Sequence, residues 1–194
     1  MKHPPQIYLA SNSPRRAELL HQIGVDFRVI AAGIDETGAA QETPEAHVTR
    51  LALEKARAGH AVLQGEHCRP VLGADTMVVA GNVVMGKPRD REEAVHMLLS
   101  LSGKTHRVLS AVALVDATEA FRLSISQVTF RSLTRAECES YWGTGEPVDK
   151  AGGYAIQGMA AMFISRLEGS YSGVMGLPLY ETAELLAAAG VRLL

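Results

Sequence analysis

Cysteine is scarce in this sequence, and long apolar runs are missing altogether. Among its 194 residues there are two cysteines, Cys68 and Cys138, which lie far apart and form no CxxC pair. A disulfide framework or a zinc site is therefore not expected, and a reducing cytoplasm fits best. No segment has the uninterrupted apolar length of a membrane span, and the first residues lack the apolar core of a signal peptide. We expect a soluble, unprocessed, cytoplasmic protein.

A strong charge of either sign is also missing. The formal net charge is −2 and the sequence pI is about 6.4, and no basic stripe or run of interleaved aromatic residues stands out, which argues against a general nucleic-acid surface. The seven histidines show no H-E-x-x-H or similar ligand spacing, so a histidine metal site is not expected. Small anionic ligands remain compatible with this balance.

Short β-branched runs alternate with helical patterns along the chain, without a repeat or a linker. This alternation predicts an α/β (mixed α+β) fold, in which helices pack on a sheet, and we expect one domain over residues 1–194. Strands are expected near residues 6–10, 26–32, 71–76, 78–85, 107–115, 122–131 and 160–166, with a hairpin turn at Gly81-Asn82. Helices are expected from residue 14 to about 23 and over residues 45–63, 91–101, 135–142 and 178–189.

The stretch SNSPRR at residues 11–16 predicts the start of a helix with an unusual charge. Ser13 is a favourable N-cap, and Pro14 suits the first helical position. The first turn already carries unpaired N–H groups and a partial positive charge, so stability alone would favour acidic residues over Arg15 and Arg16. Two guanidinium groups at a helix N-terminus can receive a polyphosphate. The alternative is solvated surface charge.

Two charged residues interrupt apolar patterns. Asp75 lies at the expected C-terminal end of an apolar strand, where open α/β sheets place ligand sites. It can coordinate Mg²⁺ or accept a proton from water, and Thr76 adds a hydroxyl; the alternative for Asp75 is a turn cap. Lys55 continues the apolar face of the 45–63 helix. It is expected to point inward or along an edge, either as a ligand or with its stem on apolar surface and its ammonium in water.

Further charged residues lie in two loops. Asp35 and Glu36 follow an expected strand and offer a second carboxylate site, although adjacent acids are commonly solvated loop residues. GNVVMGKP at residues 81–88 nearly matches the Walker phosphate loop, but Pro88 stands where Ser or Thr should bind magnesium. We reject that match and keep Lys87 as a point charge for phosphate.

Residues 145–158 are rich in glycine and charge and are expected to form a loop that runs into a strand. This loop brings Asp149, Lys150 and Gln157 close together, and a glutamine has the donor and the acceptor that suit the edge of a nucleobase. The alternative is a long surface loop. GSYSG at residues 169–173 is not a nucleophile elbow, because tyrosine stands at its centre. The charged residues together fit a metal-bound triphosphate better than a catalytic triad.

With these residues in place, the chain resembles the Maf family of nucleoside triphosphate pyrophosphatases over about residues 7–186. Nine ordered blocks carry the resemblance: LASNSPRRAELL, IDE at 34–36, LALEKA at 51–56, LGADT, GKPRD, LSGKTHRV, FRSLT, EPVDKAGGYAIQG and GSYSGVMGLPLYET. The resemblance implies an elongated mixed sheet flanked by helices, with two lobes and a central cleft, similar to inosine triphosphate pyrophosphatases. It also implies hydrolysis of a nucleoside triphosphate to the monophosphate and pyrophosphate with Mg or Mn as cofactor.

The resemblance also implies roles for matching residues. Asp75 matches the catalytic acid, either as general base or as a metal ligand, and Glu36 matches a metal-associated carboxylate. The residues expected to contact the substrate are Ser13, Arg15, Arg16, Lys55, Thr76, Lys87, Asp149, Lys150 and Gln157.

Within the family, Arg15, Thr76 and Gln157 resemble the branch that takes dTTP and UTP, and modified pyrimidine triphosphates are further candidates. A glutamine can present complementary groups to O4 and N3–H of a pyrimidine. Two alternatives stay open: a 7-methyl-GTP pyrophosphatase, and a nucleotide-binding regulator of septum formation. A homodimer is also an open expectation.

Overall fold

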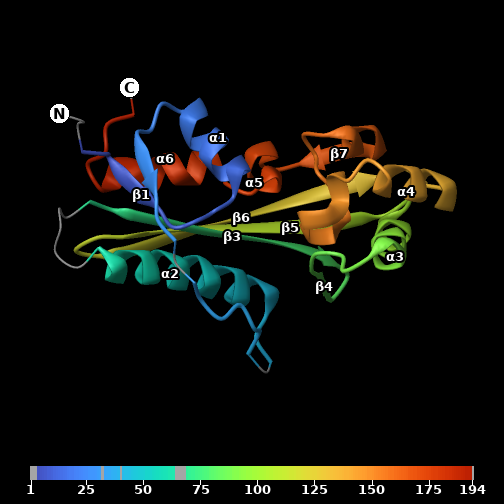
Figure 1. Ribbon diagram of the computed structural model, residues 1–194, viewed down its shortest axis with the longest axis horizontal. Coiled ribbons are helices and arrows are strands. Elements are labelled where there is room, and N and C mark those ends of the chain that lie inside the picture. The colour runs from blue at the N-terminus through green and yellow to red at the C-terminus, as the bar shows by residue number, and fades with distance from the viewer. Residues whose placement is uncertain (1–3, 32, 40, 64–68, 194) are drawn as a thin grey trace. The chain divides into compact units, whose positions relative to one another are not determined.

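The computed structural model describes residues 4–31, 33–39, 41–63 and 69–193, and its helices and strands alternate along the chain (Figure 1). The strands are β1 (Ile7–Leu9), β2 (Phe27–Val29), β3 (Val71–Ala80), β4 (Val83–Met85), β5 (Thr105–Val115), β6 (Glu119–Phe130) and β7 (Ile164–Glu168). The α-helices are α1 (Pro14–Gln22), α2 (Pro44–Val62), α3 (Arg91–Leu101), α4 (Arg135–Trp142), α5 (Tyr171–Met175) and α6 (Leu179–Ala188). Three short 3₁₀ helices are η1 (Glu146–Asp149), η2 (Ala151–Gly153) and η3 (Met159–Phe163).

The sheet is mixed, as the alternation of elements predicts. In the part of the chain that the structure describes it has seven strands in the order β2-β1-β3-β5-β6-β7, and β4 also pairs with β3. Strand β1 runs parallel to β2 and to β3, whereas the β3–β4 and β6–β7 pairs are antiparallel. The parallel strands require crossovers, which α1 and α2 supply.

The chain divides into two compact units, each of which draws on separate stretches of sequence. The first unit is Met1–Asp75, Ser110–Ser124 and Gly176–Leu194, and the second is Thr76–Leu109 and Ile125–Met175. The single domain expected from the sequence stays a prediction.

In the first unit, α2 lies on one side of the strands, and α1 and α6 lie on the other (Figure 1). Two glycines allow α2 to approach the sheet closely. A Cβ atom on Gly73 would lie 2.3 Å from the carbonyl oxygen of Ala52 and 2.5 Å from the amide nitrogen of Ala56. A Cβ atom on Gly59 would lie 2.9 Å from Cγ1 of Val71. Any side chain at these positions would push the helix away from β3.

The second unit has a core in which aromatic rings meet edge to face. The Phe130 ring contacts the rings of Tyr154 and Phe163, and Phe163 also contacts Tyr141. His106, which is 2% exposed, shares this core and lies 2.8 Å from the Tyr154 hydroxyl through Nε2. Aromatic rings of this kind bury large apolar areas, and the polar groups that they carry form hydrogen bonds inside the core.

Several predicted boundaries are wrong for identifiable reasons. The expected strands at 71–76 and 78–85 are one long strand, β3, followed by the short β4, because the chain reverses only at Gly81, whose φ is +60°. The predicted hairpin at Gly81-Asn82 is confirmed by the antiparallel β3–β4 pair. Residues 145–158 form 3₁₀ turns and do not run into a strand. The expected strand at 160–166 begins only at residue 164, after η3, and α5 was not anticipated.

Candidate active site

The centre of the candidate site is a lysine held between two carboxylates in the first unit. Nζ of Lys55 lies 2.7 Å from Oδ1 of Asp75 and 2.7 Å from Oε1 of Glu36. The Lys55 and Asp75 side chains are 12% and 11% exposed, whereas that of Glu36 is 60% exposed. Of the two directions expected for Lys55, the structure therefore shows the inward one, and its ammonium binds carboxylates instead of extending into bulk water.

The alternation of side chains along β3 explains why Asp75 faces Lys55. Gly73 and Asp75 are two residues apart and therefore lie on the same face of the strand. The Gly73 position faces α2, because its Cβ would meet the backbone of Ala52. Lys55 lies three residues after Ala52, on the same side of the helix. Asp75 consequently meets the lysine through the close packing that Gly73 permits.

Asp75 is not at the end of its own strand, so the expected location is wrong. Strand β3 continues to Ala80, and Thr76 therefore projects to the opposite face. The neighbouring strand β1 ends earlier, since Leu9 pairs with Leu72. Asp75 thus lies just beyond the carboxyl end of the neighbouring strand β1. Ligand sites of open α/β sheets lie outside the carboxyl ends of strands, so the position of Asp75 agrees with this rule through β1 and not through β3.

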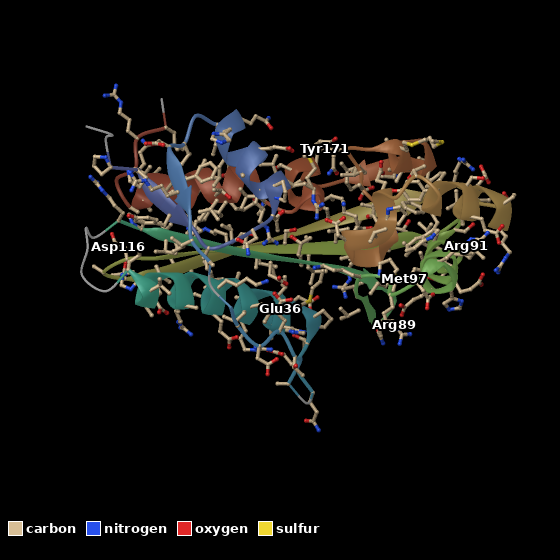
Figure 2. The ribbon with its side chains drawn as sticks, viewed as in Figure 1. Glu36, Arg89, Arg91, Met97, Asp116 and Tyr171 are labelled. Carbon is tan, nitrogen blue, oxygen red and sulfur yellow. The ribbon has the colours of Figure 1, made fainter. Side chains whose placement is uncertain are left out.

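Glu36 reaches Lys55 because its segment is fastened to α2 (Figure 2). Nε2 of His47 lies 3.2 Å from the carbonyl oxygen of Glu36. Arg50 donates from Nη2 to the carbonyl oxygen of Thr37 at 3.1 Å, and its Nε and Nη2 form a fork on the Glu42 carboxylate at 2.8 Å each. The hydrogen bonds from Arg50 lower the pKa of Glu42 to about 2. This segment is thus held by charge-assisted bonds, which are stronger than neutral ones.

The arginine turn begins helix α1 as predicted, but its serines have different roles. Ser13 occupies the N-cap position, yet its side chain makes no capping hydrogen bond. Ser11 instead accepts from the Ser13 amide at 3.2 Å and from Nη1 of Arg16 at 3.0 Å. Arg16 also donates from Nε to the carbonyl oxygen of Gly176 at 2.9 Å. Arg15 lies beside it on the first turn, partly exposed.

The Arg16 guanidinium interacts electrostatically with the Asp75 and Glu36 carboxylates that surround Lys55. Burial lowers the pKa of Arg16 below its ordinary value, and Arg15 lowers it further. Asp75 and Glu36 act in the opposite direction and raise that pKa. The first unit therefore joins four of the predicted residues: Arg16, Glu36, Lys55 and Asp75.

The second unit holds another group of the predicted residues. Lys150 forms an ion pair with its neighbour Asp149, and the Lys150 side chain is 15% exposed. The amide of Gly152 donates to the carbonyl oxygen of Gly86 at 2.9 Å, which brings this segment against the loop that carries the exposed Lys87. Gln157 is exposed on a turn that follows η2.

Sequence reasoning missed the residues that hold these groups in place. They are Ser11, His47, Arg50, Gly73, Tyr141 and Glu146. Ser11 and Glu146 stand inside blocks of the family resemblance, whereas His47, Arg50 and Tyr141 stand outside them. The groups that these side chains contact are brought to them by the fold and cannot be found from neighbouring residues. Gly73 was the one with a detectable signal: a glycine inside a strand marks a close approach of another backbone.

Among the described residues, no group of three or more His, Cys, Asp or Glu side chains is arranged to hold a metal ion. The two carboxylates around Lys55 are oxygen donors, and Mg²⁺ is commonly bound by one or two carboxylates together with substrate phosphates. The donor set therefore fits such an ion. Cys138 is a free, buried thiol, while Cys68, His3 and His67 lie outside the described residues. No helix in the described ranges has the length and apolar character needed to cross a membrane.

Comparison with solved structures gives the fold class. The chain is similar to the Ham1 protein of Staphylococcus aureus, with a TM-score of 0.52 and 14% sequence identity, over 96% of this chain and 99% of that one. At this identity the likeness concerns the fold alone. It confirms the predicted α/β class, a mixed sheet flanked by helices.

Sequence comparison then gives the family. The model of the Maf-like proteins matches residues 6–189, so the chain belongs to the Maf family. A protein of Alkalilimnicola ehrlichii named dTTP/UTP pyrophosphatase is 63% identical over 188 residues, 95% of this chain and 93% of the relative. A protein of the same name from Saccharophagus degradans is 54% identical over 185 residues, 94% of this chain and 88% of the relative.

Proposed function

We propose that this protein hydrolyses dTTP and UTP to the monophosphate and pyrophosphate, with modified pyrimidine triphosphates as further candidates. The observation that carries the proposal is the position of Lys55 Nζ, 2.7 Å from carboxylate oxygens of both Asp75 and Glu36. The substrate names come from the two relatives described above, which share more than half of their aligned residues with this chain.

In the proposed reaction Asp75 accepts a proton from the water that attacks the α-phosphorus. The carboxylate is suited to this role because Lys55 and helix α2 fix its position. A general base must first lie in the correct place relative to the attacking water before it can accelerate the reaction. Lys55 compensates part of the negative charge of both carboxylates, which would otherwise repel a polyphosphate more strongly.

The leaving pyrophosphate needs its growing negative charge stabilised. Arg16 supplies a guanidinium whose orientation is set by its bonds to Ser11 and to the Gly176 carbonyl. Its remaining N–H groups can donate to phosphate oxygens, as can the neighbouring Arg15 and the Ser13 hydroxyl. Placing these donors before the substrate arrives avoids reorganisation during the reaction.

The proposal includes a divalent cation, Mg²⁺ or Mn²⁺, held by Asp75 and Glu36. When bound, this ion would neutralise part of the triphosphate charge and lower the pKa of water that it coordinates. Support comes from the chemistry of the donors, since both residues offer carboxylate oxygens at one ammonium group.

The proposal also assigns substrate contacts to the remaining residues predicted from the sequence. Gln157 is exposed and can pair with O4 and N3–H of uracil or thymine. Lys87 and Lys150 are point charges for phosphate. Thr76 and Asp149 complete the proposed set with a hydroxyl and a carboxylate.

The test is pyrophosphate release from dTTP, UTP, CTP, GTP and 7-methyl-GTP with Mg²⁺ or Mn²⁺, for the wild type and Asp75→Asn. We expect dTTP and UTP to lead, and the variant to lose at least about 10³-fold in kcat while still binding nucleotide. Asp116→Asn is the matched control, because Figure 2 shows Asp116 at the β5–β6 turn, away from Glu36.

Other outcomes would decide for the alternatives. Preferential turnover of 7-methyl-GTP would place the chain in the other branch of the family. Nucleotide binding without hydrolysis by the wild type would favour the regulator of septum formation. Chelation with EDTA should abolish turnover, and activity that survives it would exclude the proposed metal.

Cytoplasmic location and homodimer formation also belong to this proposal. The scarcity of cysteine in the sequence supports a reducing compartment. Sedimentation of the purified chain at several concentrations would decide between monomer and dimer, and fractionation of cells would decide the location.

A further inference from the structure

The turn that carries Gln157 is held by hydrogen bonds on both sides of that residue. Before it, the amide of Ala155 donates to the hydroxyl of Tyr141 at 3.2 Å. After it, the amide of Met159 donates to Oε2 of Glu146 at 3.0 Å. The turn itself is closed by a bond from the Gly158 amide to the Ala155 carbonyl at 3.1 Å. Gln157 is exposed, whereas the backbone around it is fixed.

The two anchors form one network. The Tyr141 hydroxyl donates to Oε1 of Glu146 at 2.6 Å, and the amide of Ala160 donates to the same oxygen at 3.4 Å. Burial raises the pKa of Tyr141, and the Glu146 carboxylate raises it further, so the hydroxyl keeps its proton. The Glu146 carboxylate thus accepts a hydrogen bond from the phenol and two from backbone amides.

Gly158 shows how tightly the carboxylate is packed. A Cβ atom at this position would lie 2.2 to 2.4 Å from the carboxylate atoms of Glu146. The backbone of Gly158 has φ −110°, which is outside the left-handed region that favours glycine. The glycine is therefore required by the position of the Glu146 carboxylate and not by the turn.

We propose that Glu146 and Tyr141 are positioning residues for base selection, which hold the turn so that the Gln157 amide faces the pyrimidine edge in a fixed place. The inference rests on the role of Gln157 in the proposed function. A site that hydrogen-bonds a particular base rejects others only if its donor and acceptor cannot shift to suit them. Freeing the turn lets the amide adapt, and discrimination between uracil and cytosine falls.

The experiment compares UTP with CTP, which differ at the 4-position that Gln157 would contact. Gly158→Ala displaces the Glu146 carboxylate without asking for a new backbone conformation. Tyr141→Phe removes one hydroxyl and adds no atom, so it tests the same network should Gly158→Ala fail to fold. Glu168→Gln is the matched carboxylate control, because Glu168 lies exposed on β7.

We expect Gly158→Ala and Tyr141→Phe to lower the ratio of kcat/KM for UTP to that for CTP by about tenfold or more. The change should come from a higher KM for UTP, with kcat altered less than about threefold, because the triphosphate contacts are untouched. Glu168→Gln should keep the wild-type ratio.

Combination with Gln157→Ala separates positioning from general damage. If the network acts through Gln157, Gly158→Ala causes no further loss of discrimination in the Gln157→Ala background. A further loss there, or a wild-type ratio in both Gly158→Ala and Tyr141→Phe, overturns the inference while the proposed function stands. If Gln157→Ala alone keeps the ratio, the role of Gln157 is wrong and the inference fails with it.

Discussion

Nζ of Lys55 lies 2.7 Å from Oδ1 of Asp75, and this ion pair ties helix α2 to strand β3. Both side chains are nearly nine-tenths buried. A pair in such a place has lost much of its hydration, so neither partner can be removed without leaving a poorly solvated charge. The contact that defines the candidate site is therefore costly to break from either side.

Replacement of Lys55 by methionine should destabilise the protein and abolish activity. Loss of the ammonium leaves the Asp75 carboxylate buried beside a second carboxylate, and we expect a loss of about 3 kcal/mol in the free energy of unfolding. Urea denaturation followed by circular dichroism measures it. The double variant Lys55→Met with Asp75→Asn should recover part of the loss, and a double variant as unstable as the single one would contradict this explanation. Lys104→Met, at an exposed lysine, is the control.

Replacement of Gly73 by alanine should separate α2 from β3. The added Cβ would meet backbone atoms of Ala52 and Ala56 at 2.3 and 2.5 Å, and backbone cannot swing aside as a side chain can. We expect a loss of about 3 kcal/mol in stability, the upper end for overpacking, together with reduced turnover, because Lys55 moves with the helix. Gly33→Ala should change neither, since among the described residues no atom beyond its chain neighbours lies within 4 Å of its Cβ position. Wild-type stability of Gly73→Ala would show that the helix accommodates the methyl group.

Buried His106 should make the protein less stable in mild acid. Burial lowers its pKa to about 4 from the ordinary value of 6.5. The unfolded chain therefore binds more protons than the folded chain between these two pH values. Stability is complete above pH 6.5 and declines as the pH falls towards 4, and we expect a loss of about 1 kcal/mol between pH 7.5 and 5.5.

The measurement for His106 is urea denaturation at the two pH values. His106→Gln should remove most of the difference between them, whatever its effect on absolute stability. His96→Gln, at an exposed histidine, should retain the difference. An unchanged difference in His106→Gln would assign the acid sensitivity to other groups.

The fork of Arg50 on Glu42 should support catalysis through the Glu36 segment. Arg50→Lys cannot form two parallel bonds, so the pKa of Glu42 should rise from about 2 towards its ordinary 4.5. We expect a several-fold lower kcat, because the Thr37 carbonyl loses its donor and Glu36 is held less firmly. NMR titration of the Glu42 carboxyl and steady-state kinetics measure the two effects.

Helix α2 offers a matched control for this substitution. Arg57 forms a similar fork on Glu119, with distances of 2.8 and 2.6 Å, and this fork also lowers the pKa of Glu119. Arg57→Lys should therefore raise the pKa of Glu119 without changing turnover. Equal effects of both substitutions on kcat would argue against a specific role for the Glu36 segment.

Local features of the sequence were sufficient to predict most of the elements. The capping box at Thr134 and Glu137 is formed as expected, and α4 begins there. The N-cap of α3 at Asp90 and the turn at Gly81 were predictable for the same reason, because caps and tight turns depend on neighbouring residues. The two-strand reading of residues 71–85 failed, since no local signal distinguishes a continuous buried strand from two short ones.

The sequence by itself determined the fold class, the family motifs and the position of Lys55 on the apolar face of its helix, because periodicity, caps and motif order are properties of contiguous residues. Only the tertiary structure decided that Lys55 lies between Asp75 and Glu36, that Ser11 and the Gly176 carbonyl orient Arg16, and that Glu146 lies beneath the turn of Gln157. These contacts join segments far apart along the chain. They follow from close packing, such as that allowed by Gly73, and no local pattern encodes that packing.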